Sequence, residues 1–159
     1  MKSPGYLLAL SLAFAGCSSS GPEETLALDG LTDQFARATS EVPSFGGFAF
    51  DDDTPVVLTL GPEPSAGSVV RTIFQADIPV RARPKFGGGS EALKDRATRL
   101  LLGKVQGVQS TDYDGTTGYV RVGAVTARAV HEAHRVLESA GYPTNEVIIE
   151  VEARISLGL

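Results

Sequence analysis

The clearest pattern in the chain is an alternation of apolar and polar residues close to the C-terminus. From Val147 to Leu157 every second residue is apolar, and the residues between them include Glu150, Glu152 and Arg154. A period of two predicts a β-strand that buries one face and leaves the other largely charged. We therefore expect the last strand to lie in a sheet with one partly wet face.

Three segments repeat their apolar residues every three or four positions, which predicts helices with one buried face. The first runs from Glu24 to Val42 and ends before Pro43, because the residue before a proline avoids the helical conformation. The other two begin after Ser90 and Thr126, whose hydroxyl groups favour helix starts.

Short apolar runs bounded by turn residues predict further strands. Asp114-Gly115 is a strong hairpin signal between two of these runs. The segment from Val69 to Phe74 fits either a helix or a strand. The expected extended runs are residues 48–50, 56–60, 78–83, 108–113 and 119–125.

In order, residues 78–157 predict strand, helix, strand, strand, helix, strand. This is the split βαβ, or ferredoxin-like, arrangement, which we expect to place both helices on one face of an antiparallel sheet. Residues 24–64 precede it as an N-terminal helix and β-hairpin, which we expect to cover part of the other face. The fold class is therefore α+β, in a single domain spanning residues 24–159, and no internal repeat is apparent.

The chain begins with the features of an export signal. Lys2 is followed by an apolar run that begins at Tyr6 and is shorter than the roughly 20 residues needed to span a bilayer. A basic start, an apolar run of this length and small residues before a cut site predict a secretory signal peptide over residues 1–16. Its end, Ala15-Gly16-Cys17, resembles the lipobox of bacterial lipoproteins.

The lipobox resemblance implies cleavage between Gly16 and Cys17 and transfer of a diacylglyceryl group to the cysteine sulfur. Two acyl chains give a durable anchor, whereas one holds weakly, and residues 17–23 then form the lipidated cysteine and a flexible tether. The expected location is the cell membrane or outer membrane, with the domain facing the periplasm or cell exterior. Because Cys17 is the only cysteine, the alternatives are a thiol lost with an ordinary signal peptide or a free surface thiol.

The charge of the chain excludes one class of partner. With 14 basic and 19 acidic residues, the net charge is −5. An acidic chain without a lysine or arginine cluster binds nucleic acid poorly, because neutralised phosphates supply most of that affinity. We expect a membrane contact through Cys17 and a protein partner, and no nucleic acid.

His131 and His134 are the only histidines. Zinc-protease helices use two histidines four positions apart, which places both rings on one side of the metal. Here the separation is three positions, and no third ligand is indicated. We expect His134 to flank the buried stripe of its helix and His131 to face water, as on a solvated helix surface. The sequence predicts no metal site and no cofactor.

Two other motifs have plain interpretations. Asp51-Asp52-Asp53 lacks the alternate spacing, the glycine and the terminal glutamate of a calcium loop, so it predicts an acidic turn. Gly87-Gly88-Gly89-Ser90 could cradle an anion on backbone N–H groups, but it lacks the lysine of a phosphate loop and better fits a flexible joint or a helix lead-in. No Gly-x-Ser-x-Gly motif is present, and no catalytic residue is predicted.

Two stretches resemble a recurrent module of exported bacterial proteins. The first is Val42-Pro43-Ser44-Phe45-Gly46-Gly47, with the acidic turn and β-rich return that follow it. The second comprises Gly118 to Gly123, Gly141-Tyr142-Pro143 and Val147 to Val151. The module is similar to the prosegments of secreted chymotrypsin-like serine proteases of bacteria. That resemblance carries over no catalytic residue and implies a protease-inhibitor or chaperone-like role.

These observations favour a non-enzymatic, lipid-anchored domain of the cell envelope. We expect it to bind a protein partner through strand edges or through the wet face of its sheet. The alternative is a small-ligand receptor or enzyme with a site near His134 and the turn at Asp51–Asp53.

Overall fold

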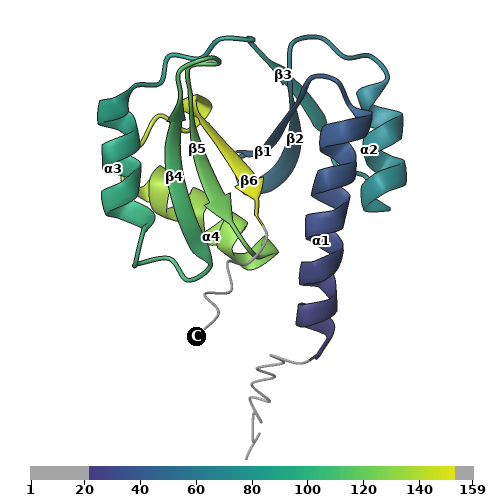
Figure 1. Ribbon diagram of the computed structural model, residues 1–159, viewed down its shortest axis with the longest axis horizontal. Helices are drawn as coiled ribbons and strands as arrows, with labels where there is room; N and C mark the ends of the chain where they lie inside the picture. Colours follow the sequence, from purple (N-terminus) through teal and green to yellow (C-terminus); the bar gives the residue numbers. More distant parts are fainter. Residues whose placement is uncertain (1–21, 153–159) are drawn as a thin grey trace, which may run out of the picture.

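The computed structural model describes residues 22–152, with side chains from residue 31 onward. Figure 1 shows a sheet with helices packed against it. The sheet has six strands in the order β3-β2-β1-β6-β5-β4. In chain order the elements are α1 (Pro22–Glu41), β1 (Phe45–Asp51), β2 (Thr54–Leu60), α2 (Ala66–Phe74), β3 (Val80–Arg83), α3 (Glu91–Leu101), β4 (Val108–Asp114), β5 (Tyr119–Ala124), α4 (Ala127–Ser139), the 3₁₀ turn η1 (Thr144–Glu146) and β6 (Val147–Val151).

The order helix, strand, strand, helix, strand occurs twice. We call residues 22–83 the N-terminal repeat and residues 91–151 the C-terminal repeat. In each repeat the first two strands form an antiparallel hairpin, and the third strand returns after a helix to lie parallel to the second. The repeats meet where β1 and β6 pair in antiparallel fashion, with Phe48 opposite Ile149. The chain thus repeats its order of elements and their pairing, although no internal repeat is apparent in the sequence.

The α+β class is confirmed, but the ferredoxin-like arrangement is not. That arrangement would place β3 between β5 and β6 in an antiparallel sheet. Instead the sheet is mixed: β6 lies beside β5 and parallel to it, while β3 lies at the far edge beside β2. The reason is that α2 and α4 each connect two parallel neighbours, so that each hairpin receives its own third strand.

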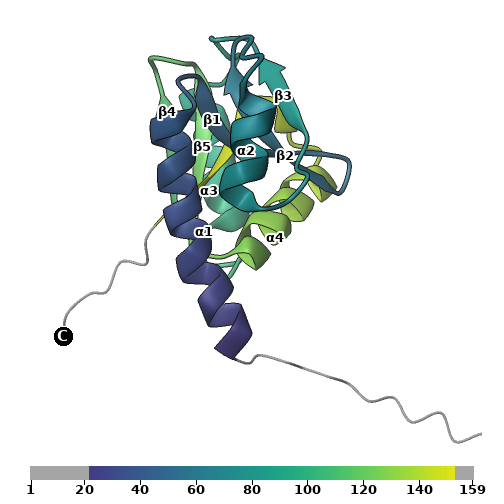
Figure 2. The ribbon, with the colours of Figure 1, turned by 90° about the vertical axis from the view of Figure 1, so that its right-hand side faces the viewer.

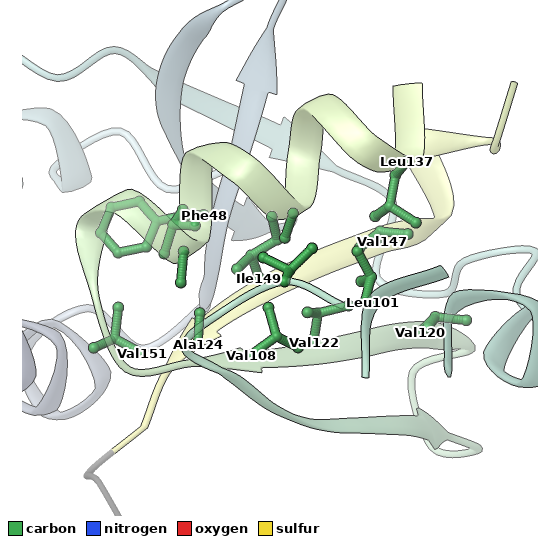
Figure 3. Packing of buried hydrophobic residues seen from close by; sticks show 14 of the residues in the cluster. Phe48, Leu101, Val108, Val120, Val122, Ala124, Leu137, Val147, Ile149 and Val151 are labelled. Atoms are coloured by element: carbon green, nitrogen blue, oxygen red, sulfur yellow. The ribbon is translucent and has the colours of Figure 1, made fainter. Parts of the chain in front are cut away.

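All four helices contribute to one hydrophobic core. Ala38 of α1, Val70 of α2, Leu101 of α3 and Ala133 of α4 are fully buried and belong to the same cluster. Alternate residues of the strands pack into this cluster, as Figure 3 shows. On β5 and β6 these residues are Val120, Val122, Ala124, Val147, Ile149 and Val151.

Local sequence signals set the helix starts as expected. The Ser90 hydroxyl accepts a hydrogen bond from Leu93 N–H (3.2 Å) at the start of α3, and the Thr126 hydroxyl accepts one from Ala129 N–H (2.8 Å) at the start of α4. The undecided segment, residues 69–74, lies in α2, where its apolar residues join the core.

The opposite face of the sheet carries a smaller apolar cluster. Ile148 of β6 is fully buried there, in a cluster with Tyr119 and Leu58. This face is therefore less wet than the alternation of the last strand predicts. That strand ends at Val151 in the structure, and residues 153–159 lie outside the described residues.

The N-terminal helix and hairpin do not cover this opposite face, contrary to expectation. The β1–β2 hairpin is part of the sheet itself. Phe35 of α1 packs in the main core against Phe45 and Phe48, with ring centroids 5.0 and 5.8 Å apart. Figure 2 shows α1 lying beside α2. The helices of the described chain therefore share the core side of the sheet.

Candidate functional site

The segment between the two repeats, residues 84–90, is held against the C-terminal repeat, and we call it the inter-repeat loop. Gly87 N–H donates to Thr117 O (2.7 Å), and Gly89 N–H donates to Gly118 O (2.8 Å), at the turn between β4 and β5. The packing requires glycine, because a Cβ atom on Gly87 would lie 2.7 Å from Gly118 O. Backbone hydrogen bonds thus tie the loop to this turn, which does not fit a flexible joint, whereas the other predicted role, a helix lead-in, is confirmed by the Ser90 cap of α3.

The anion that contacts the inter-repeat loop is a carboxylate of the protein itself. Gly88 N–H donates to the carboxylate of Glu146 in η1, so a side chain of the chain itself occupies the cradle that the glycines predict. The Tyr119 hydroxyl donates to Pro84 O (2.7 Å) at the start of the loop. The loop is therefore attached to the C-terminal repeat along its length.

Phe86 differs from the other large apolar side chains of the described residues because it is exposed. It is 66% exposed, and the Lys85 ammonium lies 5.9 Å from the centre of its ring. A hollow of about 150 Å³ opens beside it, bordered by the polar side chains of Arg83, Asn145 and Glu146. We call Phe86, Lys85 and this hollow the Phe86 surface.

Arg83 crosses from the N-terminal repeat to the C-terminal repeat. Its guanidinium donates to Thr144 O (3.2 Å) and to Val147 O, although β3 itself lies at the far edge of the sheet. Burial lowers the pKa of Arg83, against the opposing effect of Tyr119 and Glu146. Burial also raises the pKa of Tyr119. Both side chains donate to main-chain oxygens, which is a structural role.

His134 connects α4 to the turn between β1 and β2. It is only 6% exposed, and its ring stacks on Phe50 with centroids 4.3 Å apart. Its Nε2 lies 2.9 Å from Asp52 O, which accepts the hydrogen bond, and 3.8 Å from a Glu138 carboxylate oxygen. His131 is exposed, as expected. The position of His134 beside the buried stripe is confirmed, but its ring is buried and does not lie on a solvated surface.

Of the three acidic residues in this turn, the structure brings Asp53 to His134. Asp51 forms an ion pair with an arginine on β3 (2.7 Å), and Asp52 presents its carbonyl from a left-handed conformation with φ of 53°. Ligand atoms of Asp53, His134 and Glu138 all lie within 4.8 Å of one another, and we call these three residues the His134 cluster. Sequence reasoning missed Glu138, although residues four positions apart are neighbours on a helix.

Charged side chains on the opposite face of the sheet form a network across three strands. Arg121 of β5 pairs with Asp114 of β4 (3.2 Å) and with Glu150 of β6. Glu152 accepts a hydrogen bond from Ser110 of β4 (2.7 Å). Burial raises the pKa of Glu150, against the opposing effect of Arg121. These charges are paired within the sheet, so the network is explained without a ligand.

The predicted cleavage and lipidation residues, Gly16 and Cys17, lie outside the described residues. Within residues 22–152, no helix is both long enough and apolar enough to cross a membrane. No protein-family model matches the chain, and no curated protein matches it. The lipobox and the likeness to protease prosegments therefore remain predictions from the sequence.

Proposed function

We propose that the protein is a non-enzymatic, lipid-anchored binding module of the cell envelope. Cys17 would carry the anchor, and residues 18–21 would separate it from α1. The Phe86 surface would contact a protein partner. The anchor rests on the sequence of the N-terminus alone, whereas the binding surface rests on the contacts of the described residues.

The observation that carries this proposal is the exposure of Phe86 on a fixed loop. Glycine packing and backbone hydrogen bonds hold the loop against the turn between β4 and β5. A few side chains dominate the energy of most protein interfaces, and aromatic rings are prominent among them. Because the backbone on both sides of Phe86 is already held, binding at this ring costs little backbone conformational entropy. These properties favour recognition of a partner at Phe86.

The hollow beside Phe86 supplies polar groups that would orient such a partner. Arg83, Asn145 and Glu146 border it, and the Asn145 amide donates to the Glu146 carboxylate (2.9 Å). Lys85 adds a positive charge beside the ring. An aromatic anchor with polar groups at its rim has the composition of a protein interface.

The resemblance to protease prosegments gives the proposal a sharper form. The partner would then be a secreted serine protease, which the domain would inhibit or help to fold. A panel of such proteases provides the test. If the purified protein neither slows these proteases nor assists their refolding, an inhibitor or chaperone of secreted serine proteases is excluded. The broader proposal of a protein-binding surface is tested separately, by the Phe86 experiments below.

A second candidate function is a small-ligand receptor or enzyme at the His134 cluster. The observation that favours it is the approach of Asp53, His134 and Glu138 to within 4.8 Å of one another. Against an enzyme, His134 Nε2 donates to a main-chain carbonyl and is therefore not paired with a nucleophile. Ligand binding or turnover that disappears in Asp53→Asn would favour this second function.

The anchor is tested by intact mass. The full-length protein is expressed in a bacterial host, and the membrane-fraction form is compared with that of Cys17→Ala. We expect a chain that starts at Cys17 and carries a diacylglyceryl group, and we expect both features to disappear in the variant. A soluble product cut elsewhere would overturn the anchor.

The binding surface is tested by crosslinking in the native envelope. A photo-reactive amino acid at position 86 should give one discrete crosslinked protein, and the same group at Lys104, an exposed control position, should give none. Phe86→Ala should lose the partner on co-purification while its melting temperature stays unchanged. A Phe86→Ala variant that retains the partner would contradict the proposal.

A further inference from the structure

We propose that the His134 cluster binds a divalent transition-metal ion, with Zn²⁺ as the expected occupant. The cluster lies where the turn between β1 and β2 meets α4. The proposal depends neither on the lipid anchor nor on the Phe86 surface, because it uses none of their residues.

The cluster gathers three side chains that could turn their ligand atoms toward one ion. Ligand atoms of Asp53, His134 and Glu138 all lie within 4.8 Å of one another. Zinc binds nitrogen and oxygen at about 2.0–2.2 Å in a tetrahedral arrangement, which places two ligand atoms of one ion about 3.3–3.6 Å apart. Asp53 and Glu138 are exposed and can close the difference by rotating their side chains. The His134 ring needs little movement, because its stacking on Phe50 holds it.

The donor atoms favour a transition metal over calcium. One imidazole nitrogen and two carboxylates suit zinc and related ions, whereas calcium takes oxygen ligands. Binding through Nε2 requires the neutral imidazole to carry its proton on Nδ1. The hydrogen bond from Nε2 to Asp52 O (2.9 Å) is then replaced by the bond to the metal. The Asp52 carbonyl then has to move away from Nε2 to make room for the ion, and from the new position it can serve as a fourth oxygen ligand.

The bound ion would connect the two repeats. Asp53 belongs to the N-terminal repeat, and His134 and Glu138 belong to the C-terminal repeat. An ion that binds only where both repeats are in place stabilises the folded chain by mass action. We therefore expect Zn²⁺ to raise the melting temperature as well as to bind.

The test uses the full-length protein without a histidine tag, in whichever form it is obtained from the cell, stripped with EDTA and titrated calorimetrically with Zn²⁺. We expect one ion per chain and a rise in melting temperature of several degrees. Asp53→Asn and Glu138→Gln change exposed side chains, and each should weaken zinc binding at least about tenfold. The matched controls are Asp51→Asn in the same turn and Glu132→Gln in the same helix, whose affinities should stay within about twofold of the parent.

Two results would overturn the proposal. One is the absence of stoichiometric binding, and the other is binding that survives both Asp53→Asn and Glu138→Gln, because the ion would then lie elsewhere. A preference for Ca²⁺ over Zn²⁺ would overturn the assigned class of ion. Co²⁺ provides a spectroscopic readout, since its absorption on a nitrogen and oxygen site should disappear in His134→Gln. Circular dichroism checks that this buried substitution leaves the fold intact.

Discussion

A hydrogen bond joins Ser110 of β4 to Glu152, which follows β6, although β5 lies between these two strands. The Ser110 hydroxyl donates to a Glu152 carboxylate oxygen (2.7 Å). Glu152 reaches it by lying over Gly123 of β5, where a Cβ atom would overlap both partners. This part of the charged network therefore requires a strand position without a side chain.

Gly123→Ala should destabilise the protein by about 1–3 kcal/mol, because the new methyl group displaces the Glu152 carboxylate from Ser110. The free energy of unfolding from urea denaturation measures this loss. Gly115→Ala is the matched control, since a Cβ atom at Gly115 meets nothing within 4 Å. It should change stability by less than about 0.5 kcal/mol. Equal losses in the two variants would contradict the role of Gly123.

Arg83→Lys should cost about 1–2 kcal/mol, because one ammonium group cannot reproduce the two-nitrogen contact of a planar guanidinium with Thr144 O and Val147 O. Arg81→Lys on the same strand is the control. Arg81 forms an exposed ion pair with Asp51, and such pairs contribute about 0–1 kcal/mol. The free energies of unfolding of both variants, from chemical denaturation, test this prediction. If Arg83→Lys lowers the free energy of unfolding no more than Arg81→Lys does, the hydrogen bonds of Arg83 do not stabilise the contact between the repeats.

Asp114 should make stability depend on acid pH. Hydrogen bonds from Thr116, Thr117 and Arg121 hold the pKa of its carboxyl well below the usual range. A carboxylate with a depressed folded-state pKa stabilises the fold above its unfolded-state pKa of about 3.9, and this contribution is lost as the pH falls. Between about pH 6 and pH 3 the parent should therefore lose about 1 kcal/mol more than Asp114→Asn.

The measurement for Asp114 is urea denaturation at a series of pH values. Asp112→Asn serves as the control, because Asp112 lies on the same strand, is exposed, and accepts a local hydrogen bond from Tyr113 N–H (2.8 Å). Its pH dependence should follow that of the parent. An acid-side slope that is the same in all three proteins would show that Asp114 is not its source.

Gly87→Ala should release the inter-repeat loop, because the added Cβ atom would lie 2.7 Å from Gly118 O. We expect cleavage within residues 84–90 to become about tenfold faster, equivalent to about 1.4 kcal/mol of lost local stability. Limited proteolysis followed by mass spectrometry locates and times the cuts. Gly67→Ala in α2, where the new methyl group meets no atom within 4 Å, should leave the loop intact. Unchanged cleavage in Gly87→Ala would show that the glycine does not hold the loop.

The helix starts and hairpins follow from the sequence because a few neighbouring residues decide each of them. Ser90 and Thr126 cap their helices with their own hydroxyl groups. The order of the strands in the sheet cannot be predicted in the same way. It depends on pairings such as Phe48 with Ile149, two residues that lie far apart in the chain. In the sequence, the two repeats share one short similarity: the first strand of each hairpin ends with an aromatic residue followed by an aspartate. These pairs are Phe50-Asp51 and Tyr113-Asp114.

The candidate sites can be predicted only in part. The sequence places His134 near the acidic turn as one alternative, and the structure brings Asp53 to it. Phe86 is missed because sequence alone does not show whether an aromatic ring lies in the core or on the surface. The glycines that follow Phe86 indicate flexibility in the sequence, whereas in the fold they permit close contact with Gly118. Glycine thus permits flexibility where nothing packs against it and close packing where another backbone segment does.

The two outer strands of the sheet have counterparts inside it. By position in the repeats, β3 corresponds to β6, and β4 corresponds to β1. The pairing that joins the repeats is β6 with β1, so β3 and β4 leave counterparts of these two strands at the two edges of the sheet. Head-to-tail addition through such edges gives a ring or an open filament, depending on the rotation between successive molecules. β3 has only four residues, and Arg81 and Arg83 are two of them. Shortness and charge are common means by which edge strands resist addition. The two edges of the sheet thus correspond to strands that pair inside it, while the short, charged β3 has features that oppose addition at its edge.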